Sequence, residues 1–145
     1  QIEEMRNVKL SFPEEGDKTQ FIVSVKVHDG YYRNKYLKFK FILDDNWPNT
    51  PPKVVAVDKI WHPNIRFDPD HYSQNSHIDL SLLGHDYKNS TRLSLIVEGI
   101  KFLLSNINPY DAMNQEAAVQ YLQDIQRFKS KVEEYMDEID DDSSS

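Results

Sequence analysis

The sequence predicts an α+β domain in which a four-stranded antiparallel meander is covered on one face by helices. Two observations lead to this fold class. Strand-like segments follow one another without a helical pattern between them, at 8–12, 21–28, 37–43 and 53–58. Helical patterns then follow together, at 93–104 and 114–136. Strands that succeed one another directly pair as antiparallel neighbours, and helices gathered in this way pack on one face of such a sheet.

The strands are identified by alternation and by the turns between them. Residues 1–7, ahead of the first strand, are too few for an independent helix, so we expect the first helix to be short or missing. Apolar residues at every second position place one face of the second and third strands against the core; these are Phe21, Val23, Val25 and Val27, then Leu37, Phe39, Phe41 and Leu43. The prolines within 44–52 keep that segment out of the sheet, and 53–58 forms the fourth strand.

Two helices are predicted in the second half of the chain. Residues 93–104 are apolar enough for a helix that is buried on most sides, with Ser90 or Thr91 as its N-cap. Residues 114–136 are predicted to form a single amphipathic helix. Its buried face would consist of Ala118, Leu122, Ile125, Phe128, Val132 and Tyr135. The acidic, serine-rich residues 139–145 are predicted to be a disordered tail, so that the core domain spans 1–138.

Charge and composition exclude several classes of function. The net charge of −7 argues against a nucleic-acid partner, because phosphate binding draws on clustered Lys and Arg. No stretch approaches the roughly 18 consecutive apolar residues that suggest a membrane-spanning helix, so no membrane partner is expected. The sequence contains no cysteine, which removes disulfides, thiolate metal sites and cysteine nucleophiles. The default expectation is an intracellular protein of the cytoplasm or nucleus.

The most specific pattern lies in the middle of the chain. Pro51–Pro52 precedes the fourth strand, Trp61–Asn64 reads Trp-His-Pro-Asn and opens a polar loop, and residues 78–83 close it as Ile-Asp-Leu-Ser-Leu-Leu. This pattern resembles ubiquitin-conjugating enzymes, which carry a proline pair, a strand, His-Pro-Asn, and then a cysteine within a segment like Ile-Cys-Leu-Ser-Leu-Leu. The resemblance extends over 9–136, is closest to conjugating enzymes for the Nedd-type ubiquitin-like modifier, and implies a UBC-like fold.

The resemblance places Asn64, Asp79 and Asp111 at the family's active-site positions, with His62 and Pro63 beside them. Asp79 stands where the family has its cysteine. A carboxylate does not replace a thiolate, since acylation would give a mixed anhydride that water destroys quickly. We therefore predict that no residue of the chain is catalytic, that these five positions are vestiges of an active site, and that the chain is an inactive homologue and not an enzyme.

The spacing within this pattern also departs from the family. Asn64 and Asp79 are 15 positions apart, which implies a segment inserted within 66–77. A longer loop does not have to hold Asn64 near Asp79, so we expect the geometry of the old site to be lost. At Asn64 and Asp111 the commoner role is structural, because short polar side chains in turns bond neighbouring backbone groups.

The inserted segment holds residue types that bind metals in other proteins, namely Asp68, Asp70, His71 and His77. A calcium loop beginning at Asp68 does not fit, because Pro69 follows it and Ser73 stands where glycine is needed. A zinc site formed by the two histidines remains an alternative, although a solvated loop is commoner. The glycines are isolated, so no phosphate-binding loop is present. We predict no metal and no cofactor.

Lys26, Lys38 and Lys40 alternate against the apolar positions and should point away from the core. One interpretation is an ordinary solvated sheet face. The other follows from the resemblance, which implies that this face can hold a ubiquitin-like modifier.

The favoured function is a non-catalytic ubiquitin-conjugating enzyme variant, a protein-binding and regulatory module of ubiquitin or ubiquitin-like pathways. The resemblance implies an active conjugating enzyme, a ubiquitin-like modifier or a signalling protein as partner. Two alternatives remain open. One is a signalling scaffold unrelated to ubiquitin transfer, and the other is an atypical transferase that uses Asp79 or Ser81.

Overall fold

The structure, a computed structural model, describes residues 2–71 and 76–139. Its elements in chain order are η1 (Ile2–Glu4), β1 (Val8–Ser11), β2 (Gln20–Val25), β3 (Leu37–Ile42), β4 (Lys53–Ala56), η2 (Ser81–Leu83), α2 (Leu93–Ser105), α3 (Gln115–Gln123) and α4 (Ile125–Asp137). The four strands form one sheet in the order β1-β2-β3-β4, and every neighbouring pair is antiparallel. The predicted α+β meander is confirmed.

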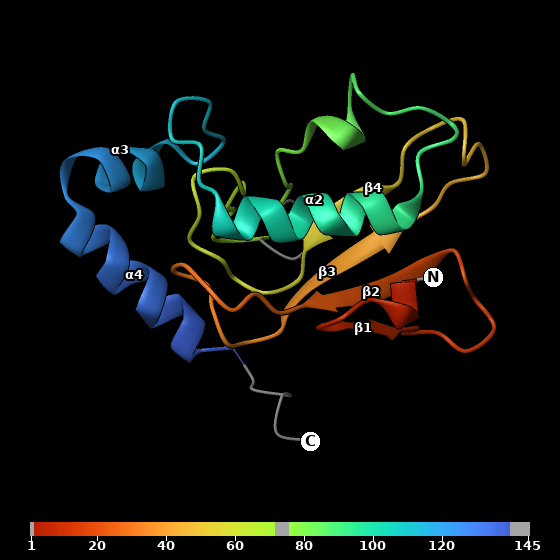
Figure 1. Ribbon diagram of the computed structural model, residues 1–145, viewed down its shortest axis with the longest axis horizontal. Coiled ribbons are helices and arrows are strands. Elements are labelled where there is room, and N and C mark those ends of the chain that lie inside the picture. The colour runs from red at the N-terminus through yellow and green to blue at the C-terminus, as the bar shows by residue number, and fades with distance from the viewer. Residues whose placement is uncertain (1, 72–75, 140–145) are drawn as a thin grey trace.

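The sheet has one core face because apolar residues alternate in register. Phe21 lies opposite Phe41, and Val23 lies opposite Phe39, so that the apolar side chains of β2 and β3 stack in rows. All four are buried. Helix α2 lies across this face of the sheet, and α3 and α4 follow at one end of the molecule (Figure 1). The core therefore lies between the sheet and α2, as the alternation predicts.

Helix α2 is confirmed within one residue of its predicted range, but its cap is not. Arg92 occupies the N-cap and makes no side-chain hydrogen bond to the first turn. The Thr91 hydroxyl instead accepts a hydrogen bond from the Lys88 amide at 3.0 Å, which closes the preceding turn. Neither Ser90 nor Thr91 caps the helix, because the backbone enters it one residue later than predicted.

The single helix predicted over 114–136 is wrong, since the structure has two helices that meet at Asp124. The φ and ψ angles of Asp124 are −149° and 73°, outside the helical range, and its carboxylate accepts a hydrogen bond from the Arg127 amide at 3.3 Å. Aspartate stabilises a helix start in this way. The break also turns part of the predicted stripe outward: Leu122 is 49% exposed and Ile125 is 39% exposed.

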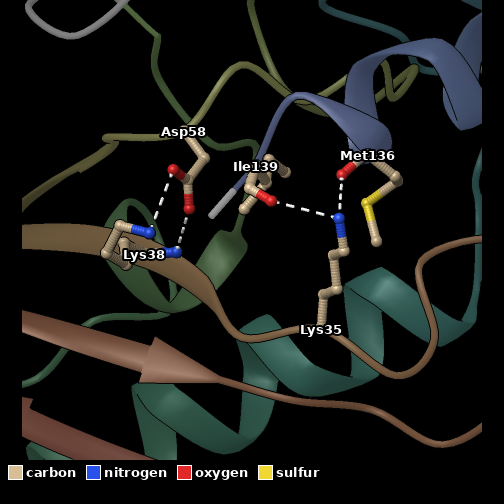
Figure 2. A network of polar contacts seen from close by, with 5 residues as sticks. All are labelled: Lys35, Lys38, Asp58, Met136 and Ile139. Carbon is tan, nitrogen blue, oxygen red and sulfur yellow. Dashed lines mark hydrogen bonds and ion pairs between the residues drawn. The ribbon is translucent and has the colours of Figure 1, made fainter. Parts of the chain in front are cut away.

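The end of α4 is held by a lysine from the segment between β2 and β3. Lys35 Nζ donates hydrogen bonds to the carbonyl of Met136 at 2.7 Å and to that of Ile139 at 3.1 Å (Figure 2). A cation stabilises the C-terminal end of a helix by pairing its last carbonyl groups. Ile139, which the sequence analysis places in the tail, is buried in the core. The rest of the predicted tail, 140–145, lies outside the described residues.

None of the helices within 2–71 and 76–139 is both long enough and apolar enough to span a membrane.

Candidate functional site

The two ends of the segment inserted after Asn64 pair with each other like the arms of a hairpin. The Arg66 amide donates to the His77 carbonyl at 2.7 Å, and the Asp79 amide donates to the Asn64 carbonyl at 2.9 Å. Ile65 and Ile78 form the bridge between these two bonds. Backbone pairing thus fixes both ends of the insertion, and Asp79 lies beside Asn64. The expectation that the longer spacing separates them is wrong.

The returning strand of this hairpin also covers the free edge of β4. The Ala56 amide donates to the Ser76 carbonyl at 2.8 Å, and Val55 forms an isolated bridge with His77. Residues 76–79 therefore pair with β4 on one side and with residues 64–66 on the other. This double pairing explains why an insertion in the loop does not displace position 79.

Asn64 connects the hairpin to the segment after α2. Its side chain is buried, and its Oδ1 accepts a hydrogen bond from the Asn108 amide at 2.9 Å. Its Nδ2 donates to the carbonyls of Asn108 at 2.8 Å and Asp111 at 3.2 Å. The side-chain amide thus pairs three backbone groups of the segment after α2. The hydrogen bond from Asn64 Nδ2 to the Asp111 carbonyl holds Asp111 near Asn64.

Pro63 extends this connection to the start of α3. Its carbonyl accepts hydrogen bonds from the amides of Met113 and Asn114, both at 2.9 Å. Asn114 is the N-cap of α3, and its side chain accepts from the Ala117 amide at 3.2 Å. Sequence reasoning missed Asn108 and Asn114. The signal available for Asn114 was an asparagine at the first position of a helical pattern.

His62 is fully buried and neutral. Its Nδ1 accepts a hydrogen bond from the Asn64 amide at 2.9 Å, so Nε2 carries the proton and donates to the Leu103 carbonyl at 2.9 Å. Tyr32 stacks on the ring at a centroid distance of 5.0 Å. Burial lowers the pKa of His62 from 6.5 to about 4, and the bond to Leu103 opposes this only in part. His62 fixes the loop and is not positioned as an acid or base.

Asp79 and Asp111 bring two carboxylates together beside Asn64. Partial burial raises the pKa of Asp79, and the charge of Asp111 raises it further. The Asp111 side chain is exposed. All five predicted site positions therefore lie in one connected segment of structure. The sequence of 145 residues contains no cysteine, so no thiol is present at this site. The reactive group at position 79 is the partly buried carboxylate of Asp79.

The predicted metal alternative finds little support in the described residues. Asp68 accepts hydrogen bonds from the backbone amides of Asp70 at 3.0 Å and His71 at 3.3 Å, as in a turn. Partial burial lowers the pKa of His77, and the charges of Lys53 and Arg66 lower it further. Such positive surroundings oppose a dication as well. No group of three or more potential ligands comes together within 2–71 and 76–139.

The outer face of the sheet carries the predicted lysines. Lys38 is held in place there, because its Nζ lies 3.2 Å from the Asp58 carboxylate and its backbone amide donates to the same carboxylate at 2.8 Å (Figure 2). Lys26 Nζ lies 4.9 Å from the centroid of the Tyr36 ring, and Lys9 Nζ lies 4.3 Å from the same centroid. Among the residues that the structure describes, Lys38 is the one of the three predicted lysines that forms an ion pair.

The register of the sheet shows which other side chains share this face. Lys40 lies opposite Ile22 on one side and Val55 on the other, and Ile42 lies between Gln20 and Lys53. Ile22 and Ile42 are only partly buried. The face thus carries lysines next to partly buried apolar side chains. Sequence reasoning missed Lys53, although its alternation with Val54 indicates the outward direction.

Comparison with known proteins gives consistent findings. The sequence matches the family described as "Ubiquitin-conjugating enzyme" over residues 2–136. The NEDD8-conjugating enzyme ubc12 of Schizosaccharomyces pombe is 34% identical over 110 residues, which are 76% of this chain and 58% of that protein. The NEDD8-conjugating enzyme UBE2F of Homo sapiens is 32% identical over 135 residues, covering 88% of this chain and 69% of that protein. The solved structure of S. cerevisiae Ubc12 superposes with a TM-score of 0.72 at 28% identity, over 88% of this chain and 68% of that one.

The chain spans less than two thirds of the length of the fission yeast relative. The prediction that the chain is an inactive homologue and not an enzyme is contradicted by the names of the relatives. That prediction rested on Asp79 in the place of the cysteine. Both relatives are named conjugating enzymes, and the residue at one position does not by itself establish inactivity.

Proposed function

Because this chain belongs to the ubiquitin-conjugating enzyme family, we propose that it acts in a NEDD8-type conjugation pathway by binding proteins. In this proposal the outer face of its sheet holds a ubiquitin-like modifier, and the domain pairs with a conjugating enzyme. The observation that carries the proposal is the arrangement of that face. The names of the relatives support the choice of pathway.

The composition of the outer face suits a protein interface. Partly buried Ile22 and Ile42 supply apolar contact on this face, and Lys40 and Lys53 stand next to them in the register. Specific interfaces combine apolar contacts with polar and charged groups. The whole chain has a net charge of −7, so lysines gathered on one face distinguish it from the rest of the surface. A partner with carboxylates around an apolar patch is complementary to it.

Rigidity is a second property that favours this face as a protein-binding surface. Its backbone belongs to the paired strands of the sheet, and Lys38 is fixed by two contacts with Asp58. A face that is already ordered loses less conformational entropy when a partner binds. The charges of Lys26 and Lys40 remain available to steer a partner and to tune its affinity.

Affinity purification after cross-linking tests the pathway. We expect the domain to retain a ubiquitin-like modifier or a conjugating enzyme, and we expect Lys26→Glu/Lys40→Glu to lose most of that material. Lys129→Glu is the matched control, because it reverses an exposed lysine on α4, away from the sheet. Recovery of signalling proteins alone, with no component of a conjugation pathway, would contradict the proposal and favour the scaffold alternative.

A transfer activity at position 79 is the second candidate function, favoured by the pairing that holds Asp79 beside Asn64. An acyl group on that carboxylate would be a mixed anhydride, whereas one on Ser81 would be an ester. Incubation with the activating enzyme, ATP and a labelled modifier separates the cases. An adduct that resists reductant, reacts with hydroxylamine and disappears in Asp79→Ala or Ser81→Ala assigns the residue. The absence of any adduct, together with hydrolysis of the activated modifier that is no faster than with the activating enzyme alone, removes this candidate.

A further inference from the structure

The inserted segment extends the outer face of the sheet beyond β4. Residues 76–78 pair with β4, and residues 64–66 pair with 76–78 in turn. These two arms, 64–66 and 76–78, are called the sheet extension below. Given the proposed function, on which this rests, we infer that the sheet extension is part of the face that holds the modifier. Its Arg66 and His77, together with Lys53 of β4, select a modifier by its carboxylates.

The register carries one row of side chains from the centre of the sheet into the extension. Ile22 lies opposite Lys40, and Lys40 lies opposite Val55. Val55 forms a bridge with His77, and the Arg66 amide donates to the His77 carbonyl at 2.7 Å. Residues directly opposite each other have their side chains on the same face of a sheet. The row that includes Ile22 therefore continues to Arg66.

Burial assigns the same direction to these side chains. Ile65 and Ile78 are buried in the core cluster, whereas Arg66 is exposed and His77 is partly exposed. On β4, the core cluster includes the neighbours of Val55 on both sides but not Val55 itself. Successive side chains of a strand point to opposite faces. Arg66 and His77 thus lie on the outer face, opposite to the core.

Positive charge gathers where the extension meets β4. The charges of Lys53 and Arg66 both act on His77, which indicates that the two cations lie near its ring. In the described parts of the chain, 2–71 and 76–139, neither Lys53 nor Arg66 has an ion-pair partner. The whole chain has a net charge of −7, so this pair of cations stands out from its surface. It favours carboxylates on the partner and disfavours lysine or arginine.

His77 makes this contact sensitive to pH. The charged groups that face it are Lys53 from β4 and Arg66 from the other arm of the extension, with Lys40 two positions along the row. Nearby cations disfavour the imidazolium form of histidine. A carboxylate placed among these groups offsets their charge, so that His77 takes up a proton when the modifier binds. Binding should therefore tighten as the pH falls from about 7.5 to about 6.

NMR titration of the isotope-labelled domain with a NEDD8-type modifier tests the extension. We expect shifts of the backbone amides of Arg66 and His77 together with that of Ile22. Lys53→Glu/Arg66→Glu should bind about ten-fold more weakly, because carboxylates of the modifier would then meet like charge. Both residues are exposed, and the backbone of Arg66 rather than its side chain pairs with His77, so the variant keeps the fold.

Two matched variants separate charge from other effects of substitution. Lys53→Arg/Arg66→Lys keeps both positive charges and should keep most of the affinity. Lys129→Glu reverses an exposed lysine on α4, away from the sheet, and should bind like the parent.

The pH dependence is assigned with His77→Gln, because glutamine forms hydrogen bonds but does not titrate. The affinity of the parent should rise about three-fold between about pH 7.5 and about pH 6, and this rise should be absent in His77→Gln. Titration of the modifier's own groups affects both proteins equally. A rise of the same size in His77→Gln would overturn the role of His77.

Two further outcomes would overturn the proposal, and they differ in what they mean for the proposed function. Shifts at Ile22 and Ile42 with an affinity that is unchanged in Lys53→Glu/Arg66→Glu would show that the sheet holds the modifier without the extension. The proposed function would then stand. An absence of shifts anywhere at millimolar modifier would overturn the proposed function as well.

Discussion

Phe128→Ala is expected to lower the free energy of unfolding by about 3–5 kcal/mol, the usual cost of removing a fully buried phenylalanine. Phe128 is completely buried in α4, and its ring packs edge-on against Tyr31 at 5.3 Å and Tyr121 at 5.2 Å. The variant leaves a cavity at the place where α4 and α3 meet the loop after β2. Domains of this kind are stable by only about 5–15 kcal/mol, so the loss would be a large fraction of the total.

Leu122→Ala is the matched control, because it removes an apolar side chain from the stripe that the sequence pattern assigns to the core. Leu122 is half exposed, and alanine is favourable in a helix, so we expect a change within about 0.5 kcal/mol. Urea unfolding of both variants measures the difference. Equal and large losses would mean that α3 and α4 pack as the single predicted helix and that the break at Asp124 is incorrect.

The second large effect is on the pH dependence of stability, through His62. Its pKa in the folded protein is about 4, against 6.5 for an ordinary histidine. Between these values the unfolded chain takes up a proton that the folded protein does not. The free energy of unfolding therefore falls as the pH decreases from 6.5 to 4, by about 3 kcal/mol in total at roughly 1.4 kcal/mol per pH unit. Above pH 6.5 the full contribution is present.

The His62 contribution is isolated by comparison with His62→Asn. Asparagine does not titrate, and its carbonyl can still accept a hydrogen bond from the Asn64 amide. The variant should be less stable at pH 7.5, and the difference from the parent should shrink steadily towards pH 4.5. His85→Asn, which removes an exposed histidine, is the control for the substitution itself. A His62 imidazole that titrates near 6.5 by NMR would contradict the burial described here.

The sheet was predictable because its pattern is local. Alternation within β2 and β3 assigns each side chain to a face without knowledge of the partner strand. The break between α3 and α4 was missed because Leu122 and Ile125 continue the helical spacing, and a single capping aspartate outweighs that pattern. Packing decides which of two compatible helical arrangements is formed, and it depends on residues far away in the chain.

Motifs in the sequence identify the residues of the candidate site. They do not show that Asn64 and Asp79 lie next to each other in the structure. Pairing between residues 64–66 and 77–79 is set by backbone hydrogen bonds across the insertion, and no single-sequence spacing reports them. The ion pair of Lys38 with Asp58 is hidden for the same reason, since the two residues are 20 positions apart. The alternation predicts that the Lys38 side chain points away from the core. Only the structure shows that Asp58 neutralises its charge.

The central claim, that the outer sheet face holds a ubiquitin-like modifier, is tested most directly by NMR titration of the isotope-labelled domain with a NEDD8-type modifier and, separately, with ubiquitin. We predict shifts of backbone amides at Ile22, Lys40 and Ile42, none at Leu122 on α3, and about ten-fold weaker binding in Lys26→Glu/Lys40→Glu. An absence of shifts at millimolar modifier, or shifts that cluster away from the sheet and persist in that variant, would contradict the claim.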